Sequence, residues 1–280
     1  MTVSNNASTA GLSSMHGVTA IAETFGRAKT EGRATFMPYW MIGYPDLSTS
    51  IAIINTLIEA GADAIELGIP FSDPLADGAV VQAAAQISLD NGTTLSDCFD
   101  AIAMIRASHS QTPLLLMGYF NPMLAYGLEH YIASAADAGA DGFIVPDLPP
   151  EESAELLRYA DPRQMALIEF LAPTSSPDRI KLVAETAKGF IYLVSVTGVT
   201  GARDTVATDL STFVDRVRQA TDLPLSVGFG ISRPEQVQQV AQIADGIIVG
   251  SALIKAGASG TNAERIEAVR SLATSLRGAC

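Results

Sequence analysis

Residues 64–78 read AIELGIPFSDPLADG, a short apolar run followed by a loop rich in proline and aspartate. In an extended strand the large apolar side chains of this run point to one side, and Glu66 points to the other beside two very small residues. A carboxylate in that position is either paired with a cation or partly desolvated, and desolvation raises its pKa toward the range of a general acid near neutral pH. The chain has no Lys or Arg between Arg33 and Arg106. We therefore favour a catalytic Glu66 over a structural ion pair.

The pattern of a short apolar run followed by a helical pattern occurs eight times. The runs lie at residues 34–42, 64–69, 113–118, 142–145, 166–171, 190–195, 225–227 and 246–249. Uniformly apolar strands that alternate with amphipathic helices are typical of parallel sheets buried on both faces. The alternative, an open doubly wound sheet, usually carries a glycine-rich dinucleotide loop after its first strand, and Gly43-Tyr44-Pro45 is not one. The sequence predicts an α/β protein with a closed (β/α)8 TIM barrel.

The residues before the first strand divide into two parts. Residues 1–16 are rich in Ser, Asn, Thr and Ala without periodicity, and we expect a disordered tail. From Val18 to Lys29 the apolar residues recur at helical spacing, which predicts an extra N-terminal helix under the barrel. Residues 17–280 are expected to form one domain, because single α/β barrels reach this size.

Charge and composition restrict the possible partners. The chain has 30 acidic and 17 basic residues, and its net charge of −13 disfavours nucleic acid and anionic membranes as partners. It has no apolar run of about 18 residues, and Cys98 and Cys280 lack metal-ligand spacing. We expect a protein of the reducing cytoplasm. It can still bind a small anionic ligand through backbone N–H groups.

Two glycine-containing segments follow the last two predicted strands. They are Gly228-Phe229-Gly230-Ile231-Ser232 and Gly250-Ser251-Ala252. Each is expected to open a helix whose first N–H groups hold a phosphate, and the two together match the recurrent phosphate site of barrels. Either segment alone would more often be a tight turn.

Several other residues and segments are open to two interpretations from the sequence. The Gly/Thr-rich segment 196–208 is expected to be a mobile lid rather than a plain solvated loop. Tyr192 either positions Glu66 or only packs. Asp77 is either catalytic or the N-cap of the next helix, and Asp73 either has a functional role or only shapes a turn. No histidine lies at a predicted strand end, and no cluster has metal spacing, so we expect neither a metal site nor histidine chemistry.

Taken together, these motifs resemble the tryptophan synthase α subunit family. The similar segments are residues 66–78, 117–122, 145–149, 192–195, 198–201, 228–231 and 249–252, within a resemblance that covers roughly residues 18 to 277. The resemblance implies a lyase that cleaves indole-3-glycerol phosphate into indole and glyceraldehyde 3-phosphate by a retro-aldol reaction.

The resemblance also implies roles for individual residues. Glu66 matches the general acid/base that protonates indole C3, Asp77 matches the carboxylate that receives the indole N–H, and Tyr192 matches a tyrosine beside the glutamate. The other matched positions serve the substrate phosphate (Gly201, Gly228, Gly230, Gly250 and Ser251), the indole pocket (Tyr39, Ile144 and Phe170) and the lid (Thr200 and Arg203).

A partner is implied as well. A β subunit that carries pyridoxal phosphate would take over the indole in an α–β–β–α assembly, and this chain itself would hold no cofactor. Pro70, Asp73 and Pro74 lie in a proline-rich segment near the expected catalytic mouth, where we expect the partner to dock. The chain departs from many relatives at residues 41–45 and at Val196, which bears on pocket-edge contacts and on the lid rather than on the reaction.

Two rival functions fit parts of the sequence. A phosphate-binding barrel isomerase would share the glycines but would usually have a catalytic His or Lys near a strand end, and none is evident. A binding subunit that had lost its chemistry would be expected to lack Glu66 or Asp77, and both are present. The sequence therefore favours an active lyase.

Overall fold

The computed structural model describes residues 16–194, 203–228 and 230–280. Eight parallel strands pair in sequence order, and the pairing of β8 with β1 closes the barrel. The strands are β1 (Thr35–Met41), β2 (Ile65–Gly68), β3 (Leu114–Met117), β4 (Gly142–Ile144), β5 (Ala166–Leu171), β6 (Ile191–Val194), β7 (Leu225–Gly228) and β8 (Gly246–Val249). Each predicted apolar run forms a strand to within one residue at either end, so the predicted barrel is confirmed.

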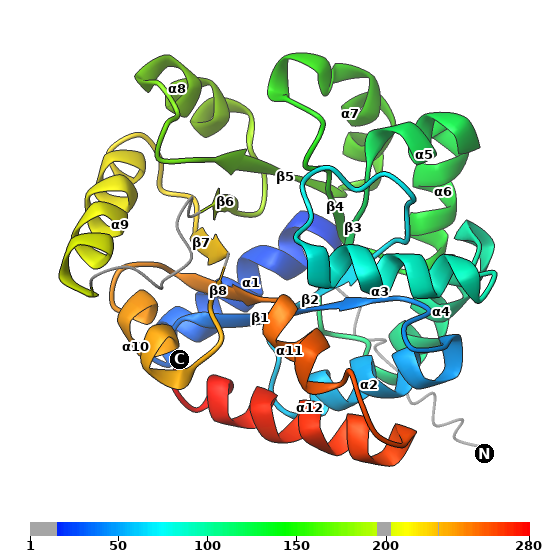
Figure 1. The fold of residues 1–280 in the computed structure, drawn as a ribbon. Helices are drawn as coiled ribbons and strands as arrows, with labels where there is room; N and C mark the ends of the chain where they lie inside the picture. The colour runs from blue at the N-terminus through cyan, green and yellow to red at the C-terminus, as the bar shows by residue number, and fades with distance from the viewer. Residues whose placement is uncertain (1–15, 195–202, 229) are drawn as a thin grey trace, which may run out of the picture.

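Helices surround the barrel; α2 to α10 lie between consecutive strands, and α11 and α12 follow β8 (Figure 1). They are α2 (Leu47–Glu59), α3 (Ala79–Asp90), α4 (Leu95–Ser108), α5 (Phe120–Tyr126), α6 (Leu128–Ala138), α7 (Ala154–Ala160), α8 (Pro177–Thr186), α9 (Arg203–Arg218), α10 (Pro234–Ala241), α11 (Ser251–Ala256) and α12 (Asn262–Arg277), with 3-10 turns η1 (Pro150–Glu152) and η2 (Asp161–Arg163). Among the described helices, none is long and apolar enough to cross a membrane.

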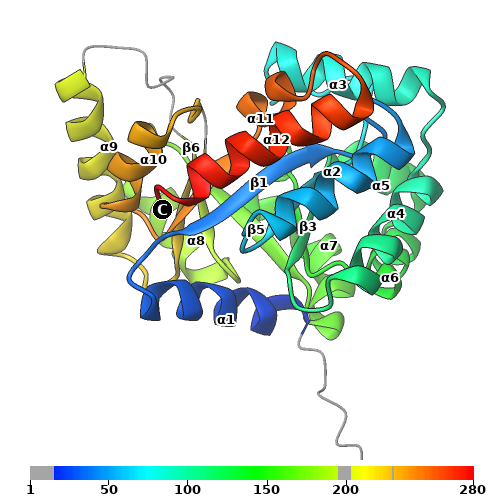
Figure 2. The ribbon, with the colours of Figure 1, turned by 90° about the horizontal axis from the view of Figure 1, so that it is seen from below.

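The predicted extra helix is α1 (Gly17–Thr30). It lies across one end of the barrel, opposite α3 and α11 (Figure 2). Its buried face includes Ile21 and Phe25, and the Phe25 ring lies 5.5 Å from the ring of Phe190. Helix α1 therefore covers the N-terminal ends of the strands. Of the expected tail at residues 1–16, only His16 lies within the described residues, where it is the N-cap of α1.

Side chains of β2 alternate between two hydrophobic clusters. Ile65 and Leu67 belong to the cluster between the barrel and its helices, whereas Ala64 belongs to the cluster inside the barrel. Glu66 follows the parity of Ala64, so its carboxylate points into the barrel interior.

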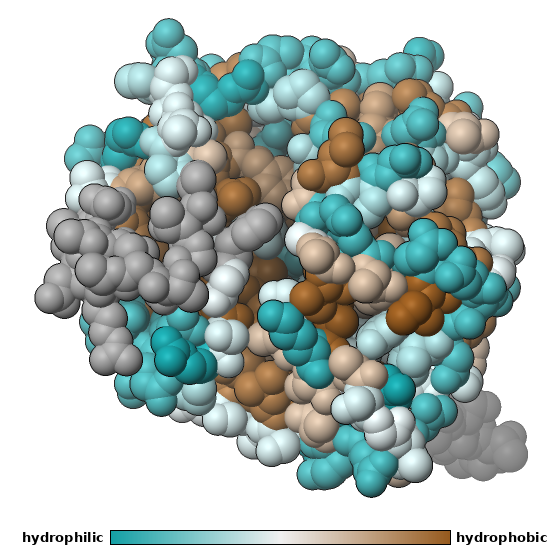
Figure 3. Space-filling view, in the orientation of Figure 1, coloured by the Kyte–Doolittle hydropathy of each residue, from teal (hydrophilic) through white to brown (hydrophobic). Residues whose placement is uncertain are grey.

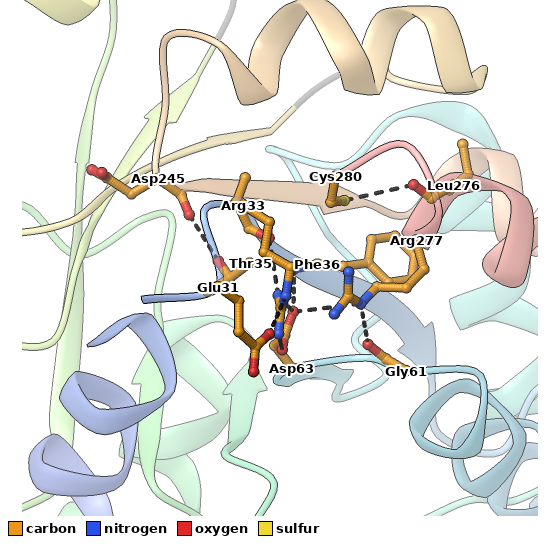
Figure 4. Close-up of polar contacts among 11 residues, drawn as sticks. Glu31, Arg33, Thr35, Phe36, Gly61, Asp63, Asp245, Leu276, Arg277 and Cys280 are labelled. Atoms are coloured by element: carbon orange, nitrogen blue, oxygen red, sulfur yellow. Dashed lines mark hydrogen bonds and ion pairs between the residues drawn. The ribbon is translucent and has the colours of Figure 1, made fainter. Parts of the chain in front are cut away.

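Aspartates fix the N-terminal ends of three strands. Asp63 accepts a hydrogen bond from the Phe36 N–H (2.9 Å) and pairs with the Arg33 guanidinium (2.7 Å), and Arg277 also points toward it (Figure 4). Asp141 and Asp245 repeat the arrangement with one strand N–H and one arginine each. Because these clamps lie at the end opposite the strand C-termini, we assign them to stability rather than to chemistry.

Two predicted boundaries are wrong. Helix α9 begins at Arg203, inside the expected lid, because residues 203–218 contain neither Gly nor Pro to stop a helix. The helical pattern that follows the apolar run at residues 113–118 forms two helices instead of one, α5 and α6, separated by Gly127 at φ +91°. Helix α5 already begins at Phe120, because proline is tolerated in the first helical turn.

Candidate active site

A cavity of about 520 Å³ opens at the C-terminal ends of the strands. Figure 3 shows this face of the molecule, with apolar side chains gathered around its centre. The lining residues are Tyr39, Glu66, Ala76, Asp77, Gly78, Ala79, Val80, Val81, Met117, Phe170, Tyr192, Val194, Gly230, Ile231, Ile248, Gly250, Ser251 and Lys255. A largely apolar cavity of this size with a few converging polar groups is typical of a small-molecule site.

Glu66 lies on β2, between Tyr39 on β1 and Leu115 on β3. The residue is 1% exposed, and its Oε1 has no hydrogen-bond partner among the described residues. Burial, and then repulsion from Asp77, raise the pKa of this carboxyl to about 8. The ion pairs of the described chain do not include Glu66, so within those residues the structural ion pair considered from the sequence is not found.

Asp77 lies on the loop between β2 and α3. Its alternative role as a helix cap is wrong, because the N-cap of α3 is Gly78 and no side chain bonds the helix end. The carboxylate instead accepts a hydrogen bond from the Tyr119 hydroxyl, whose oxygen accepts the Ala76 N–H at 3.0 Å. Burial raises the pKa of Asp77 to about 6, and the bond from Tyr119 opposes this rise.

The two carboxyl groups therefore differ in protonation. With a pKa of about 8 for Glu66 and about 6 for Asp77, Glu66 is mostly protonated near neutral pH while Asp77 is mostly ionised. When the surroundings of two carboxyl groups separate their pKa values in this way, one group can act as an acid and the other as a base. The cavity can donate a proton at one point and accept one at another.

Two tyrosines reach the cavity across glycines. A Cβ at Gly68 would lie 2.2 Å from the Tyr39 hydroxyl, and a Cβ at Gly228 would lie 2.2 Å from the Tyr192 hydroxyl. Because glycine has no side chain, Gly68 and Gly228 leave the space that the hydroxyl groups of Tyr39 and Tyr192 occupy. The Tyr192 ring also packs on Phe170, with ring centroids 4.8 Å apart. Negative charge on Glu66 adds to the effect of burial in raising the pKa of Tyr192, which is consistent with these two groups being close together.

The two glycine segments behave differently. Gly250 is the N-cap of α11, which begins at Ser251, and both residues line the cavity. The expectation that the other segment also opens a helix is wrong, because α10 begins only at Pro234. Proline is favoured in the first helical turn, which sets this later start. Gly230 lines the cavity with φ +73°, and Gly228 does not line it.

The remaining residues predicted for the site differ in whether they line the cavity. Phe170 lines the cavity, whereas Ile144 is fully buried in the interior cluster with Tyr192 and is not one of the lining residues that the structure describes. Arg203 is the first residue of α9. Thr200 and Gly201 lie outside the described residues.

The loop after β2 is mostly exposed. Asp73 is exposed and accepts a hydrogen bond from the Ser72 hydroxyl (2.5 Å), and Pro70 and Pro74 are half-buried. Leu75 is 92% exposed, the largest exposed fraction among the large apolar side chains described. Beside this loop, a shallow surface hollow is lined by Phe71, Leu95, Asn121, Pro122, Ala125 and Tyr126.

Sequence reasoning missed Tyr119 and Leu75 as site residues. Tyr119 directly follows a predicted strand, which was a usable signal, but its bond to Asp77 depends on the packing of two loops. Leu75 stands between proline and alanine, and nothing local distinguishes it from a buried leucine. Among the described residues, no group of three or more His, Cys, Asp or Glu side chains could hold a metal ion.

Comparisons with known proteins agree with one another. The sequence pattern of the family described as tryptophan synthase alpha chain matches residues 25–278. The tryptophan synthase alpha chain of Chloroflexus aggregans is 54% identical over 234 residues, which cover 84% of this chain and 88% of that relative. The alpha chain of Geobacter sp. (strain M21) is 47% identical over 257 residues, covering 92% and 96%.

Solved structures are similar as well. The tryptophan synthase alpha chain of Legionella pneumophila superposes with a TM-score of 0.85 at 33% identity, covering 95% of this chain and 97% of that one. A structure of tryptophan synthase from Mycobacterium tuberculosis gives a TM-score of 0.84 at 36% identity, covering 92% and 97%.

Proposed function

The chain belongs to the tryptophan synthase alpha chain family, and from this premise we propose which residues carry out its reaction. The enzyme is a lyase that cleaves indole-3-glycerol phosphate to indole and glyceraldehyde 3-phosphate, and it works with the tryptophan synthase β subunit, which uses the indole. The residue roles below are our proposals.

Glu66 and Asp77 divide the proton transfers. Protonated Glu66 delivers a proton to indole C3, while ionised Asp77 receives the indole N–H and stabilises the positive charge that develops on the ring. The Glu66 carboxylate then removes the proton of the side-chain hydroxyl, and the bond between C3 and the glycerol chain breaks to leave an aldehyde. The N–H proton returns from Asp77 to the ring, so the reaction neither consumes nor releases protons. The pKa values of about 8 and about 6 support this division.

Aromatic side chains hold the indole. We propose that Tyr39 and Phe170 wall the ring, and that Tyr192 keeps Glu66 in position while packing on Phe170. Ile144 supports this wall from behind, because it lies in the interior cluster with Tyr192. A pocket with apolar walls favours the neutral indole ring and keeps water from the reacting atoms.

The substrate phosphate binds at the last two strands. Gly230, Gly250 and Ser251 line the cavity there and offer backbone N–H groups and one hydroxyl. Gly228 contributes by making room for the Tyr192 hydroxyl. We also propose that Gly201 binds the substrate phosphate. Thr200 and Arg203 are proposed to belong to the lid.

The β subunit docks on the loop after β2. Pro70, Asp73 and Pro74 lie there, and the exposure of Leu75 beside the hollow at Phe71 supports an apolar contact surface. Because the same loop carries Asp77, docking would fix a catalytic carboxylate in place. We propose that pyridoxal phosphate belongs to the β subunit, that this chain uses no cofactor because its carboxyl groups account for the proton transfers, and that the enzyme acts in the cytoplasm.

One observation carries the proposal: a buried carboxyl group without a described cation shares a cavity with a second carboxylate of lower pKa. The test is consumption of indole-3-glycerol phosphate by the purified chain, with and without a matched β subunit. Glu66→Gln should keep substrate binding and lose about 10²- to 10⁴-fold in turnover, the usual contribution of general acid–base catalysis. Turnover within a few-fold of the wild type would overturn the role of Glu66.

A further inference from the structure

The cavity poses an electrostatic problem for a phosphate ester. The chain has a net charge of −13, and the cavity contains the ionised carboxylate of Asp77. A phosphate ester is a dianion near neutral pH, so both the whole protein and the cavity repel it over distances comparable to the Debye length. Backbone N–H groups act only at contact and do not offset this repulsion as the substrate approaches.

Lys255 is the one Lys or Arg among the described residues that line the cavity. It lies on α11, four residues after Ser251, so both side chains lie on the same face of that helix. Helix α11 stands beside α3, whose Val80 and Val81 line the same cavity (Figure 1). Lys255 lines the cavity and is also exposed, which places it at the mouth.

The ammonium group of Lys255 is also unpaired among the residues that the structure describes. No ion pair of the described chain includes it. By contrast, Lys181 pairs with Glu185, and Lys188 pairs with Asp161. A cation that has no described partner and lies at the mouth of this cavity is available to an anionic ligand.

We propose that Lys255 recognises the phosphate group of the substrate, drawing the dianion into the cavity and holding it beside Gly250 and Ser251. This inference rests on the function proposed above and adds a specificity-determining side chain to it. Lys255 would separate phosphate esters from neutral analogues, because a dianion gains from a nearby ammonium group and a neutral molecule does not.

The test compares charge variants of the full chain. Lys255→Met removes the charge and keeps the length of the side chain, Lys255→Arg restores the charge, and Lys181→Met makes the same charge change on α8, away from the cavity. Binding of glycerol 3-phosphate and of indole is measured by calorimetry. Cleavage of indole-3-glycerol phosphate in complex with the β subunit is followed from about 0.05 to about 0.5 M ionic strength, a range over which screening changes strongly.

Lys255→Met should weaken glycerol 3-phosphate about 10-fold, the scale of one charge-assisted hydrogen bond. Its effect on cleavage should be concentrated in KM, the fall of kcat/KM with salt should become shallower, and Lys255→Arg should recover most of the loss. Indole should bind as before.

Three results would overturn the proposal. They are unchanged binding of glycerol 3-phosphate by Lys255→Met, an equal loss for indole, and an equal effect of Lys181→Met. Absence of cleavage by the wild-type complex would instead refute the proposed function, and the glycerol 3-phosphate arm would still decide the role of Lys255.

Discussion

Replacing Glu66 by Gln should change how the stability of the folded chain depends on pH. Burial and Asp77 raise the pKa of the folded-state carboxyl from 4.5 to about 8. A group whose pKa is higher in the folded state stabilises the fold fully below its unfolded-state pKa, and this contribution is lost as the pH rises through the folded-state value. The wild type should therefore lose stability between about pH 5 and pH 8, and Glu66→Gln should lack this loss.

The size of the effect follows from the same two pKa values. One pKa unit corresponds to about 1.4 kcal/mol. With 4.5 in the unfolded chain and about 8 in the folded chain, the stabilising contribution is roughly 3 kcal/mol at about pH 6 and close to zero at about pH 9. Because Glu66 is 1% exposed, solvent screening does not reduce this figure appreciably. The stability of Glu66→Gln relative to the wild type should rise by roughly 3 kcal/mol over this interval.

Urea unfolding at a series of fixed pH values measures this difference. The free energy of unfolding is extrapolated to zero urea for the wild type and for Glu66→Gln, and their difference is plotted against pH. Asp73→Asn is the matched control, because it also exchanges a carboxylate for an amide but at an exposed position of the following loop. Its difference from the wild type should stay constant.

Parallel stability curves for the wild type and Glu66→Gln would refute the reasoning. They would mean that Glu66 already loses its proton in the folded state well below neutral pH. Protonated Glu66 would then not be the acid that delivers a proton to the substrate, whatever effect the mutation has on turnover.

Three further predictions concern activity. The kcat of the complex with the β subunit should follow a bell-shaped pH profile with limbs near 6 and 8, because Asp77 must be ionised and Glu66 protonated; a flat profile from about pH 5 to about pH 9 would contradict this. Gly68→Ala should lower kcat/KM, because the new Cβ would lie 2.2 Å from the Tyr39 hydroxyl oxygen and 2.6 Å from its Cζ, so that the whole Tyr39 ring has to move; activity within a few-fold of the wild type would show that the position of this ring does not matter for the reaction. Asp73→Ala should reduce activation by the β subunit and leave the slow rate of the isolated chain nearly unchanged, as steady-state assays with and without the β subunit would show; equal losses would argue against a docking role.

Local sequence was sufficient to predict the barrel. Each strand is a short run of apolar residues between helices with amphipathic periodicity, and burial on both faces imposes that pattern directly. The inward direction of Glu66 also followed locally, because side chains alternate along a strand whatever surrounds it. The acidic loop after β2 and the glycine at position 250 could also be found from the sequence, because both directly follow predicted strands and functional residues of barrels lie at strand C-termini.

Contacts between distant segments were decided only by the tertiary structure. Asp77 was equally consistent with a helix cap until Tyr119, which lies on a loop that follows another strand, supplied its hydrogen-bond partner. Ile144 has the right parity and the right strand for the indole pocket, yet it lies in the packed interior, because cavity depth depends on how far each strand extends. Lys255 looked like any helical surface lysine. Barrel closure brings α11 beside β1 and α3. Lys255 thereby lines the same cavity as Asp77, and no local sequence pattern indicates this neighbourhood.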